Sequence, residues 1–175
     1  MSLSHHTLHS LPVTVANTEP GIDTGEVIQR LDQALGLLQR YVPHRYHRMQ
    51  RDVHQLVVQR FPCRGAFFPA ERAILTELTF LVNPSFTPAQ IAASIVHEAT
   101  HARVAASLRG NVMNRRPREE RLCRMAELEF GTAVPEGAAV VERARASLAL
   151  TDEGVAPEID WEEAWRRTGR REDEP

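Results

Sequence analysis

Apolar residues recur every three or four positions along most of the chain, a pattern that predicts a mostly helical protein. The best-marked run follows Thr87-Pro88-Ala89-Gln90, which supplies a capping hydroxyl, a proline at the first helical position and a glutamine three residues after the cap. Apolar side chains cover nearly every face of that helix, so we expect it to be buried. The predicted helices span 26–41, 49–61, 88–108, 118–130 and 135–148.

A second pattern, rich in β-forming residues, predicts a small sheet between the second and third of these helices. It covers 66–68 and, after a turn, 73–82, where Asn83-Pro84 ends the run. Side chains alternate over 76–82, as in a strand with one buried face. We therefore interpret the chain as an α+β protein that is mostly helical and has a small β-sheet.

The two ends of the chain depart from these patterns. Residues 1–21 contain Ser, Thr, Pro and Gly without sustained periodicity, and we expect a flexible N-terminal arm there. Residues 151–175 hold nine acidic residues and four arginines, with Trp161 and Trp165 one helical turn apart, which predicts an acidic extension with a short docked helix. No internal repeat or linker divides 22–150, so we expect a single domain there.

The composition excludes several kinds of function. All 21 basic residues other than histidine are arginine, so the chain has no lysine for a Schiff base or a P-loop. The formal net charge of −2 gives no basic field for nucleic acid or an anionic membrane. We find neither a secretory signal nor an apolar run near the roughly 18 residues of a membrane span. Two cysteines cannot form a disulfide framework, and we expect a cytoplasmic protein.

The motif His97-Glu98-Ala99-Thr100-His101 stands within the helix that we expect to be buried. A spacing of four places both imidazoles on one helix face, where each can reach one zinc ion at roughly 2.0 to 2.1 Å. An unpaired buried polar group costs roughly 1 to 3 kcal/mol, and a bound metal offsets that cost. The alternative is that both histidines are core residues that hydrogen-bond to buried carboxylates.

A catalytic zinc ion needs a third protein ligand. No histidine follows His101, and positions 104 and 107 hold Val and Ser, which excludes the longer motif with a glycine and a third histidine. The remaining donors are carboxylates and Cys123, and the best placed are Glu119 and Glu120 at the start of the next helix. Helical periodicity does not choose between these two glutamates.

From Leu78 to Phe130 the chain resembles the zincin metallopeptidases, and among them the gluzincin branch, in which a glutamate on a second helix completes the H-E-x-x-H site. This resemblance implies a zincin-like single domain that holds Zn²⁺ on an active-site helix and cleaves a peptide or amide bond of a peptide or protein substrate. It favours Glu120 over Glu119, because 18 residues separate Glu120 from the motif and a Glu-x-x-Cys sequence follows. The implied zinc ligands are His97, His101 and Glu120.

The same resemblance assigns Glu98 as the general base, which accepts a proton from the attacking water. By analogy, a strand within 76–82 would pair with an extended peptide, although its alternating Leu78, Phe80 and Val82 fit an ordinary core strand equally well. Gluzincin peptidases commonly stabilise the oxyanion with a downstream tyrosine or histidine, but both tyrosines here precede the motif. The candidates for that role are His44, His47, His54 and Arg103. The alternative function is a non-catalytic zincin-fold module that binds a metal or a protein partner.

Overall fold

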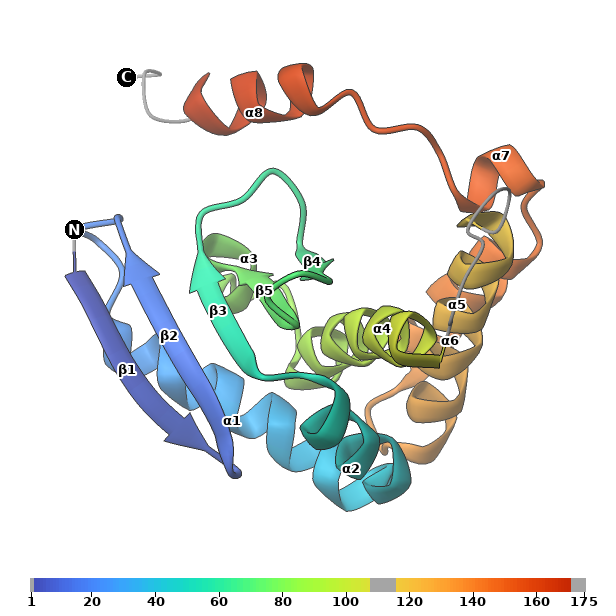
Figure 1. Cartoon of the computed structure of the whole chain (residues 1–175), viewed down its shortest axis with the longest axis horizontal. Coiled ribbons are helices and arrows are strands. Elements are labelled where there is room, and N and C mark those ends of the chain that lie inside the picture. Colours follow the sequence, from blue (N-terminus) through green and yellow to red (C-terminus); the bar gives the residue numbers. More distant parts are fainter. Residues whose placement is uncertain (1, 108–115, 171–175) are drawn as a thin grey trace.

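The computed structural model describes residues 2–107 and 116–170, which form an α+β structure around a small mixed sheet (Figure 1). The strands are β1 (Ser2–Leu8), β2 (Leu11–Asn17), β3 (Gln55–Gln59), β4 (Gly65–Phe68) and β5 (Ala73–Glu77). The helices are α1 (Thr24–Tyr41), α2 (Pro43–Asp52), α3 (Leu78–Val82), α4 (Pro88–Ser107), α5 (Arg116–Ala133), α6 (Ala138–Leu148), α7 (Asp152–Val155) and α8 (Trp161–Arg170). None of the helices in these two ranges has the length and apolarity that crossing a membrane requires.

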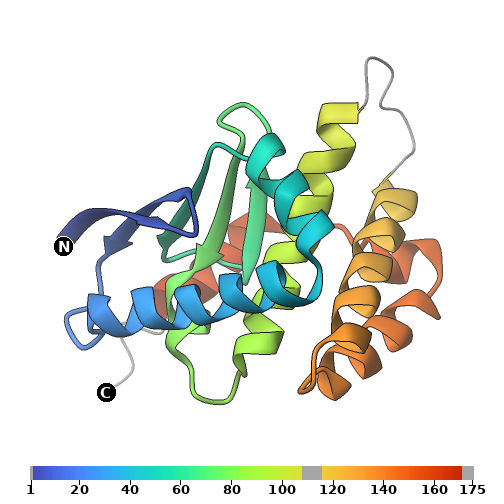
Figure 2. The same cartoon turned by 90° about the horizontal axis from the view of Figure 1, so that it is seen from below.

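The sheet has the strand order β1-β2-β3-β5-β4. Its three inner strands run parallel to one another, and both edge strands, β1 and β4, are antiparallel to their neighbours. Helix α1 crosses one side of this sheet in the view from below, while α5 and α6 stand apart from it (Figure 2). Helix α4 packs against α1, α2, α5, β4 and β5. This central position places the H-E-x-x-H motif between the sheet and α5.

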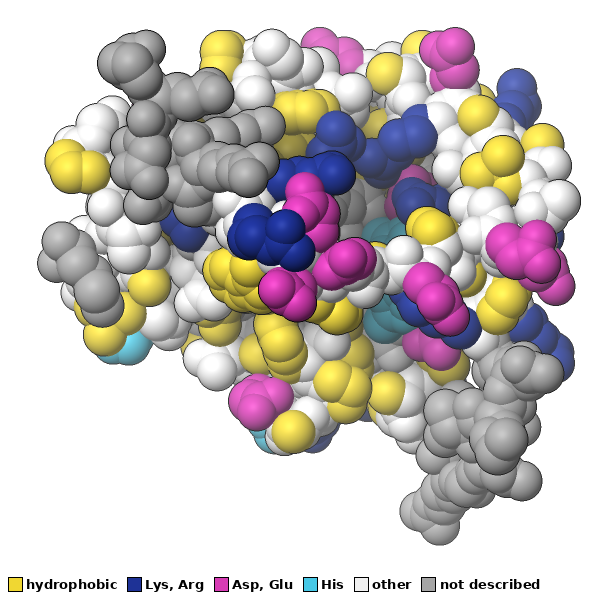
Figure 3. All heavy atoms as spheres, turned by 90° about the horizontal axis from the view of Figure 1, so that it is seen from above, with side chains coloured by type: hydrophobic (Ala, Val, Ile, Leu, Met, Phe, Trp, Pro, Cys, Tyr) yellow, Lys and Arg dark blue, Asp and Glu magenta, His cyan; other side chains and the backbone are white. Residues whose placement is uncertain are grey.

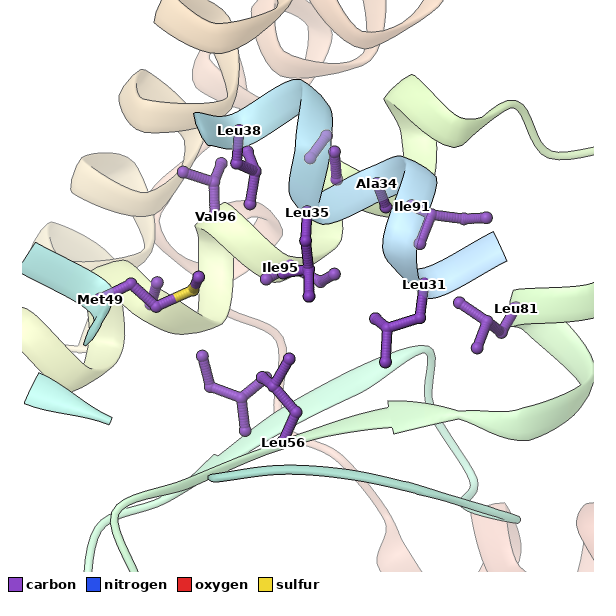
Figure 4. Packing of buried hydrophobic residues seen from close by; sticks show 14 of the residues in the cluster. Leu31, Ala34, Leu35, Leu38, Met49, Leu56, Leu81, Ile91, Ile95 and Val96 are labelled. Atoms are coloured by element: carbon purple, nitrogen blue, oxygen red, sulfur yellow. The ribbon is translucent and has the colours of Figure 1, made fainter. Parts of the chain in front are cut away.

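The core lies between α1, α4 and the sheet (Figure 4). Leu31 and Leu35 occupy successive turns of one face of α1, and Ile91 and Ile95 do the same on α4. Leu56 of β3 faces them from the sheet, and all five side chains are at most 1% exposed. Each such burial stabilises the fold by about 1.5 to 3 kcal/mol. The helical spacing of these apolar residues thus places them on the core faces of α1 and α4.

The prediction of a flexible arm over 1–21 is wrong for residues 2–17, which form the β1-β2 hairpin. Leu11, Val13 and Val15 alternate with more exposed residues and pack into the core. The tight turn at His9 and Ser10 has φ angles of 48° and 66°, a conformation that most non-glycine residues avoid. Hydrogen bonds to the His9 carbonyl hold it in place, because Tyr46 Oη donates at 2.6 Å and Gln50 Nε2 at 3.1 Å.

The prediction of a helix over 49–61 is also wrong. Helix α2 starts earlier, at Pro43, and ends at Asp52, and the chain then enters β3. Val53, with φ −113° and ψ 132°, is already extended. The β-branched pair Val57-Val58 continues an alternating burial pattern between β2 and β5. Tertiary pairing with two neighbouring strands overrides the helical spacing of the apolar residues.

The strand predicted over 73–82 ends at Glu77, and residues 78–82 form the short helix α3. The Glu77 side chain caps this helix by accepting hydrogen bonds from the Phe80 amide at 2.6 Å and the Thr79 hydroxyl at 2.7 Å. The two remaining residues of the stretch, Thr76 and Glu77, lie in β5 between β3 and β4. The expected peptide-pairing edge over 76–82 is therefore wrong, and β4 is the edge on that side.

The other helices follow the sequence more closely. The helix over 88–108 is confirmed as far as Ser107, and position 108 lies outside the described residues, as do 171–175 of the acidic extension. The capping box is formed. The backbone N–H of Gln90 donates to Thr87 Oγ1 at 3.3 Å, and the backbone N–H of Thr87 donates to Gln90 Oε1 at 2.9 Å. The predicted short helix on Trp161 and Trp165 is α8. The helix expected over 118–130 is α5, which extends further at both ends. The helix expected over 135–148 is α6, which begins three residues later, at Ala138, because Pro135 lies in the turn before it.

Candidate metal centre

The H-E-x-x-H motif lies in the second half of α4, where the helix faces α5. His97 and Glu98 are buried and His101 is partly buried. The i,i+4 spacing puts the two imidazole rings one above the other, with ring centroids 5.0 Å apart. On α5, Glu120, Cys123 and Glu127 recur at spacings of three and four and meet the same surface of α4.

Three donor groups converge at the centre of this contact. His97 Nε2 and His101 Nε2 are 3.2 Å apart, and Glu120 offers one oxygen 3.3 Å from His97 Nε2 and the other 3.5 Å from His101 Nε2. Two ligand atoms that each lie about 2.0 to 2.1 Å from zinc at a tetrahedral angle are about 3.3 Å from one another. The separation of the two nitrogens is close to that value, and each nitrogen has a different oxygen of Glu120 at a similar distance, so these three residues are placed to bind a zinc ion together.

The opposite nitrogen of each ring is held by a different carboxylate. His97 Nδ1 lies 2.7 Å from Glu127 Oε1, and His101 Nδ1 lies 2.7 Å from Glu119 Oε1. A carboxylate accepts the Nδ1 proton and leaves the Nε2 lone pair free for a metal, which is the usual arrangement of ligating histidines. The two neighbouring glutamates thus have different places: Glu119 faces the outer side of His101, and Glu120 faces the convergence point.

Among the acidic residues of 2–107 and 116–168, Glu127 has the least exposed side chain, with 0% exposure. It accepts hydrogen bonds from Arg124 at 2.7 Å and from Arg143 of α6 at 3.0 Å, in addition to its contact with His97. Burial opposes its charge, but His97, Arg143 and Arg124 hold the pKa of Glu127 below the usual range of a glutamate. The sequence interpretation missed this residue, although it stands on the same helical stripe as Glu120 and Cys123.

Cys123 lies one turn beyond Glu120 and is fully buried. One ligand atom from each of His97, His101 and Cys123 lies within 4.8 Å of the others. Burial raises the pKa of the thiol to about 11, and the nearby His101 opposes that rise. Cysteine sulfur is a good zinc ligand, so Cys123 is a fourth donor within reach of the same point.

The carboxylates around the two rings favour a positive charge between them. Burial lowers the pKa of His101, but hydrogen bonds to Cys123, Glu119 and Glu120 outweigh burial and raise this pKa to about 12. Burial likewise works against a charge on Glu120, while hydrogen bonds from His101 and His97 keep its pKa well below the usual value. Two Nε2 lone pairs at 3.2 Å would repel each other, so a cation, either a proton or a metal, stabilises the pair.

Beside this centre lies a cavity of about 380 Å³, lined by the motif on one side and by Ala66 and Phe67 of β4 on the other. Histidine side chains are visible deep in a hollow of the face that carries α8 (Figure 3). Glu98 lines this cavity, and burial raises its pKa above the usual glutamate value, although His97 and His101 oppose the rise. A carboxylate in such a setting is suited to proton transfer near neutral pH.

Strand β4 begins against this carboxylate. A Cβ atom added to Gly65 would lie 3.2 Å from Glu98 Cγ and 3.1 Å from Ser94 Oγ, so only glycine fits without displacing them. The sequence interpretation gave Gly65 no role, because a single glycine at a strand end carries no signal of what lies across from it.

The residues considered for the oxyanion do not line this cavity. His44 pairs with Glu129, His54 contacts Arg72, and Arg103 lies 3.9 Å from Asp52. Tyr46 is buried below the β1-β2 turn. Within residues 2–107 and 116–170, the structure therefore brings together the motif and the two glutamates of α5 but none of these other candidates.

Comparisons of the chain with protein-family models, with curated proteins and with solved structures find no match. The gluzincin resemblance remains a prediction from the sequence.

Proposed function

We propose that the protein is a zinc-dependent hydrolase of peptide or amide bonds, with a zincin-like active site on α4. The observation that supports this most is the convergence of three residues: His97 Nε2 and His101 Nε2 lie 3.2 Å apart, and the two oxygens of Glu120 lie 3.3 Å from the first nitrogen and 3.5 Å from the second. Both Nδ1 atoms are already engaged by other carboxylates, so the rings are oriented for metal binding in advance.

The reaction divides between the metal and Glu98. Zinc bound to these donors would polarise the scissile carbonyl and lower the pKa of water to about 7. Glu98 accepts the proton of the attacking water and delivers it to the leaving nitrogen, a role that its raised pKa supports. Glu127 and Glu119 hold the two imidazole rings in the tautomer that binds metal.

The substrate in this proposal is an extended polypeptide that lies along β4. This strand forms one edge of the sheet and lines the cavity with Ala66 and Phe67. An edge strand has unpaired backbone groups that accept a further strand, and the side chains beside it give specificity. The edge expected over 76–82 is thus replaced by β4, which lies next to Glu98.

Metal analysis of purified variants tests the proposal together with hydrolysis of a casein-derived peptide mixture. Glu98→Gln should retain zinc and lose hydrolysis, because it changes the proton acceptor and leaves the ligands intact. Glu120→Ala should lose zinc far more readily than Glu119→Ala, since loss of a residue that only orients a ligand costs about 10- to 100-fold in metal affinity. Unchanged hydrolysis in Glu98→Gln, or full zinc content in Glu120→Ala, would contradict the assignment.

One observation favours a second candidate, a non-catalytic metal-binding module. Cys123 lies near both histidines and supplies a fourth protein donor, and zinc sites closed by four protein ligands are structural rather than catalytic. In this alternative, Cys123→Ala would weaken zinc binding and destabilise the protein. In the hydrolase, Cys123→Ala would keep both zinc and hydrolysis, because water and substrate use the fourth position.

A further inference from the structure

The chain that follows α7 runs back toward the sheet before it forms α8 (Figure 1). Ile159 and Trp161 from this segment line the same cavity as His97, Glu98 and His101. More than 50 residues separate Ile159 from the motif in the sequence, so a tertiary contact brings them together. Part of the protein's own acidic extension thus forms one wall of the cavity in which a substrate would bind.

Where it borders the cavity, the segment has no regular secondary structure. Residues 157–160 have no helix or strand assignment, and α8 begins only at Trp161. The Arg116 guanidinium donates to the Pro157 carbonyl at 2.9 Å and holds the start of the crossing. At its end, Asp160 accepts a hydrogen bond from the Glu163 amide at 2.9 Å and caps α8. Five residues, 156–160, connect α7 to α8, and these two hydrogen bonds hold the start of the connection to α5 and its last residue to α8.

The contacts that hold the segment are few and solvent-exposed. Trp161 and Trp165 pack against Phe61, with ring centroids 6.0 and 5.5 Å apart. Ile159, Trp161 and Trp165 are nevertheless 42%, 45% and 47% exposed. Val155 in α7 is the last buried side chain among the residues described up to Thr168. The segment beyond α7 can therefore leave without opening the core.

We propose that residues 157–161 are an internal occupant of the substrate groove, which a peptide of similar chemistry displaces. This inference rests on the proposed function only in naming the groove as a substrate site. The residues of the segment indicate the ligand class: an extended chain with a bulky apolar side chain between acidic residues, as in Glu158-Ile159-Asp160. Ala66, Phe67 and Pro69 line the same cavity and offer apolar surface to such a side chain.

Competition between the attached segment and a free peptide tests this inference. The probe is a fluorescein-labelled peptide with the sequence of residues 155–162, and the proteins are the full chain and its Ile159→Asp variant. In the variant, the aspartate weakens binding of the attached segment to the cavity, so the segment competes less with the free peptide. The peptide should therefore bind the variant about tenfold more tightly than it binds the full chain, because part of one apolar contact is worth about that factor in affinity. A labelled peptide that itself carries Ile159→Asp should bind neither protein.

A matched control separates this effect from the added charge alone. Leu150 is an exposed apolar residue, 48% accessible, that does not line the cavity, and Leu150→Asp should bind the peptide as weakly as the full chain. Equal peptide affinities of the full chain and Ile159→Asp, or no binding to Ile159→Asp, would overturn the inference. Fluorescence anisotropy of the label measures peptide binding whether or not zinc is present. The result therefore tests this inference even if the protein hydrolyses no peptide.

The reactivity of Cys63 gives a second measurement on the unlabelled protein. Cys63 is partly buried and lines the same cavity as Ile159 and Trp161, whereas Cys123 is fully buried. Ile159→Asp should raise the rate at which an aromatic disulfide reagent modifies Cys63 about tenfold, in parallel with peptide affinity, and should leave Cys123 unreactive. An unchanged rate at Cys63 would show that the segment does not cover the cavity and would refute the inference.

Discussion

The substitution Glu127→Gln tests whether a buried carboxylate organises the site. The Glu127 side chain has 0% exposure and three charged or ring partners, His97 Nδ1 at 2.7 Å, Arg124 at 2.7 Å and Arg143 at 3.0 Å. Glutamine keeps the shape and one acceptor oxygen, but its amide group turns two N–H donors toward groups that also donate. Breaking a buried ion pair costs about 3 to 5 kcal/mol.

We expect a loss near 3 kcal/mol, the lower end of that range, because both arginines are partly exposed and can turn to solvent. For a chain of this size, such a loss corresponds to a fall of about 6 to 12 °C in Tm. The assay is thermal and urea unfolding in excess chelator, which removes any contribution of bound metal. Glu119→Gln is the matched control, since Glu119 makes the same 2.7 Å contact to His101 but is 26% exposed.

The control should change stability by less than about 1 kcal/mol, as expected of an exposed ion pair. Equal effects of Glu127→Gln and Glu119→Gln, or a Glu127→Gln protein as stable as wild type, would refute the view that Glu127 is a buried organising charge.

Three further predictions concern packing, the general base and pH. Gly137→Ala should prevent stable folding, measured as loss of a cooperative thermal transition, because the new Cβ would lie 1.8 Å from the Gly131 carbonyl oxygen; normal stability would contradict the geometry. Gly65→Ala should keep zinc but reduce hydrolysis, since its Cβ would displace the Glu98 side chain. An unchanged rate of hydrolysis would contradict the view that the position of β4 controls the general base. Folding lowers the pKa of Glu127, so the stability that its charge contributes is complete above about pH 4.3, the unfolded value, and is lost as pH falls further. Urea unfolding over an acid series should show this loss in wild type and not in Glu127→Gln, and parallel curves would contradict it.

Local patterns predicted some elements of the fold correctly and missed others for identifiable reasons. The capping box at Thr87 predicted where α4 begins, and the regular spacing of apolar residues predicted the extent of α1. The β1-β2 hairpin was missed because its turn, His9-Ser10, lacks the Asn-Gly signature of tight hairpins. The helix predicted over 49–61 failed because apolar residues at those spacings also fit a strand, and only pairing with β2 and β5 decides between them.

The candidate site shows the same division. The spacing of His97 and His101 was enough to predict that their rings share a face of α4. The different positions of Glu119 and Glu120 depend on how α5 crosses α4, which no local pattern contains. Glu127 was missed because a buried carboxylate needs charged partners, and one of them, Arg143, comes from another helix that the sequence pattern does not place beside it. The segment at Ile159 reaches the cavity only through the path of the chain after α7.

The central claim is that His97, His101 and Glu120 hold one zinc ion, and anomalous X-ray diffraction at the zinc edge from a zinc-loaded crystal tests it most directly. The predicted result is a single strong peak between α4 and α5, about 2.0 to 2.2 Å from Nε2 of each histidine and from a Glu120 oxygen. A zinc peak elsewhere on the protein, or two histidine rings that hydrogen-bond to carboxylates with no metal between them, would contradict the claim.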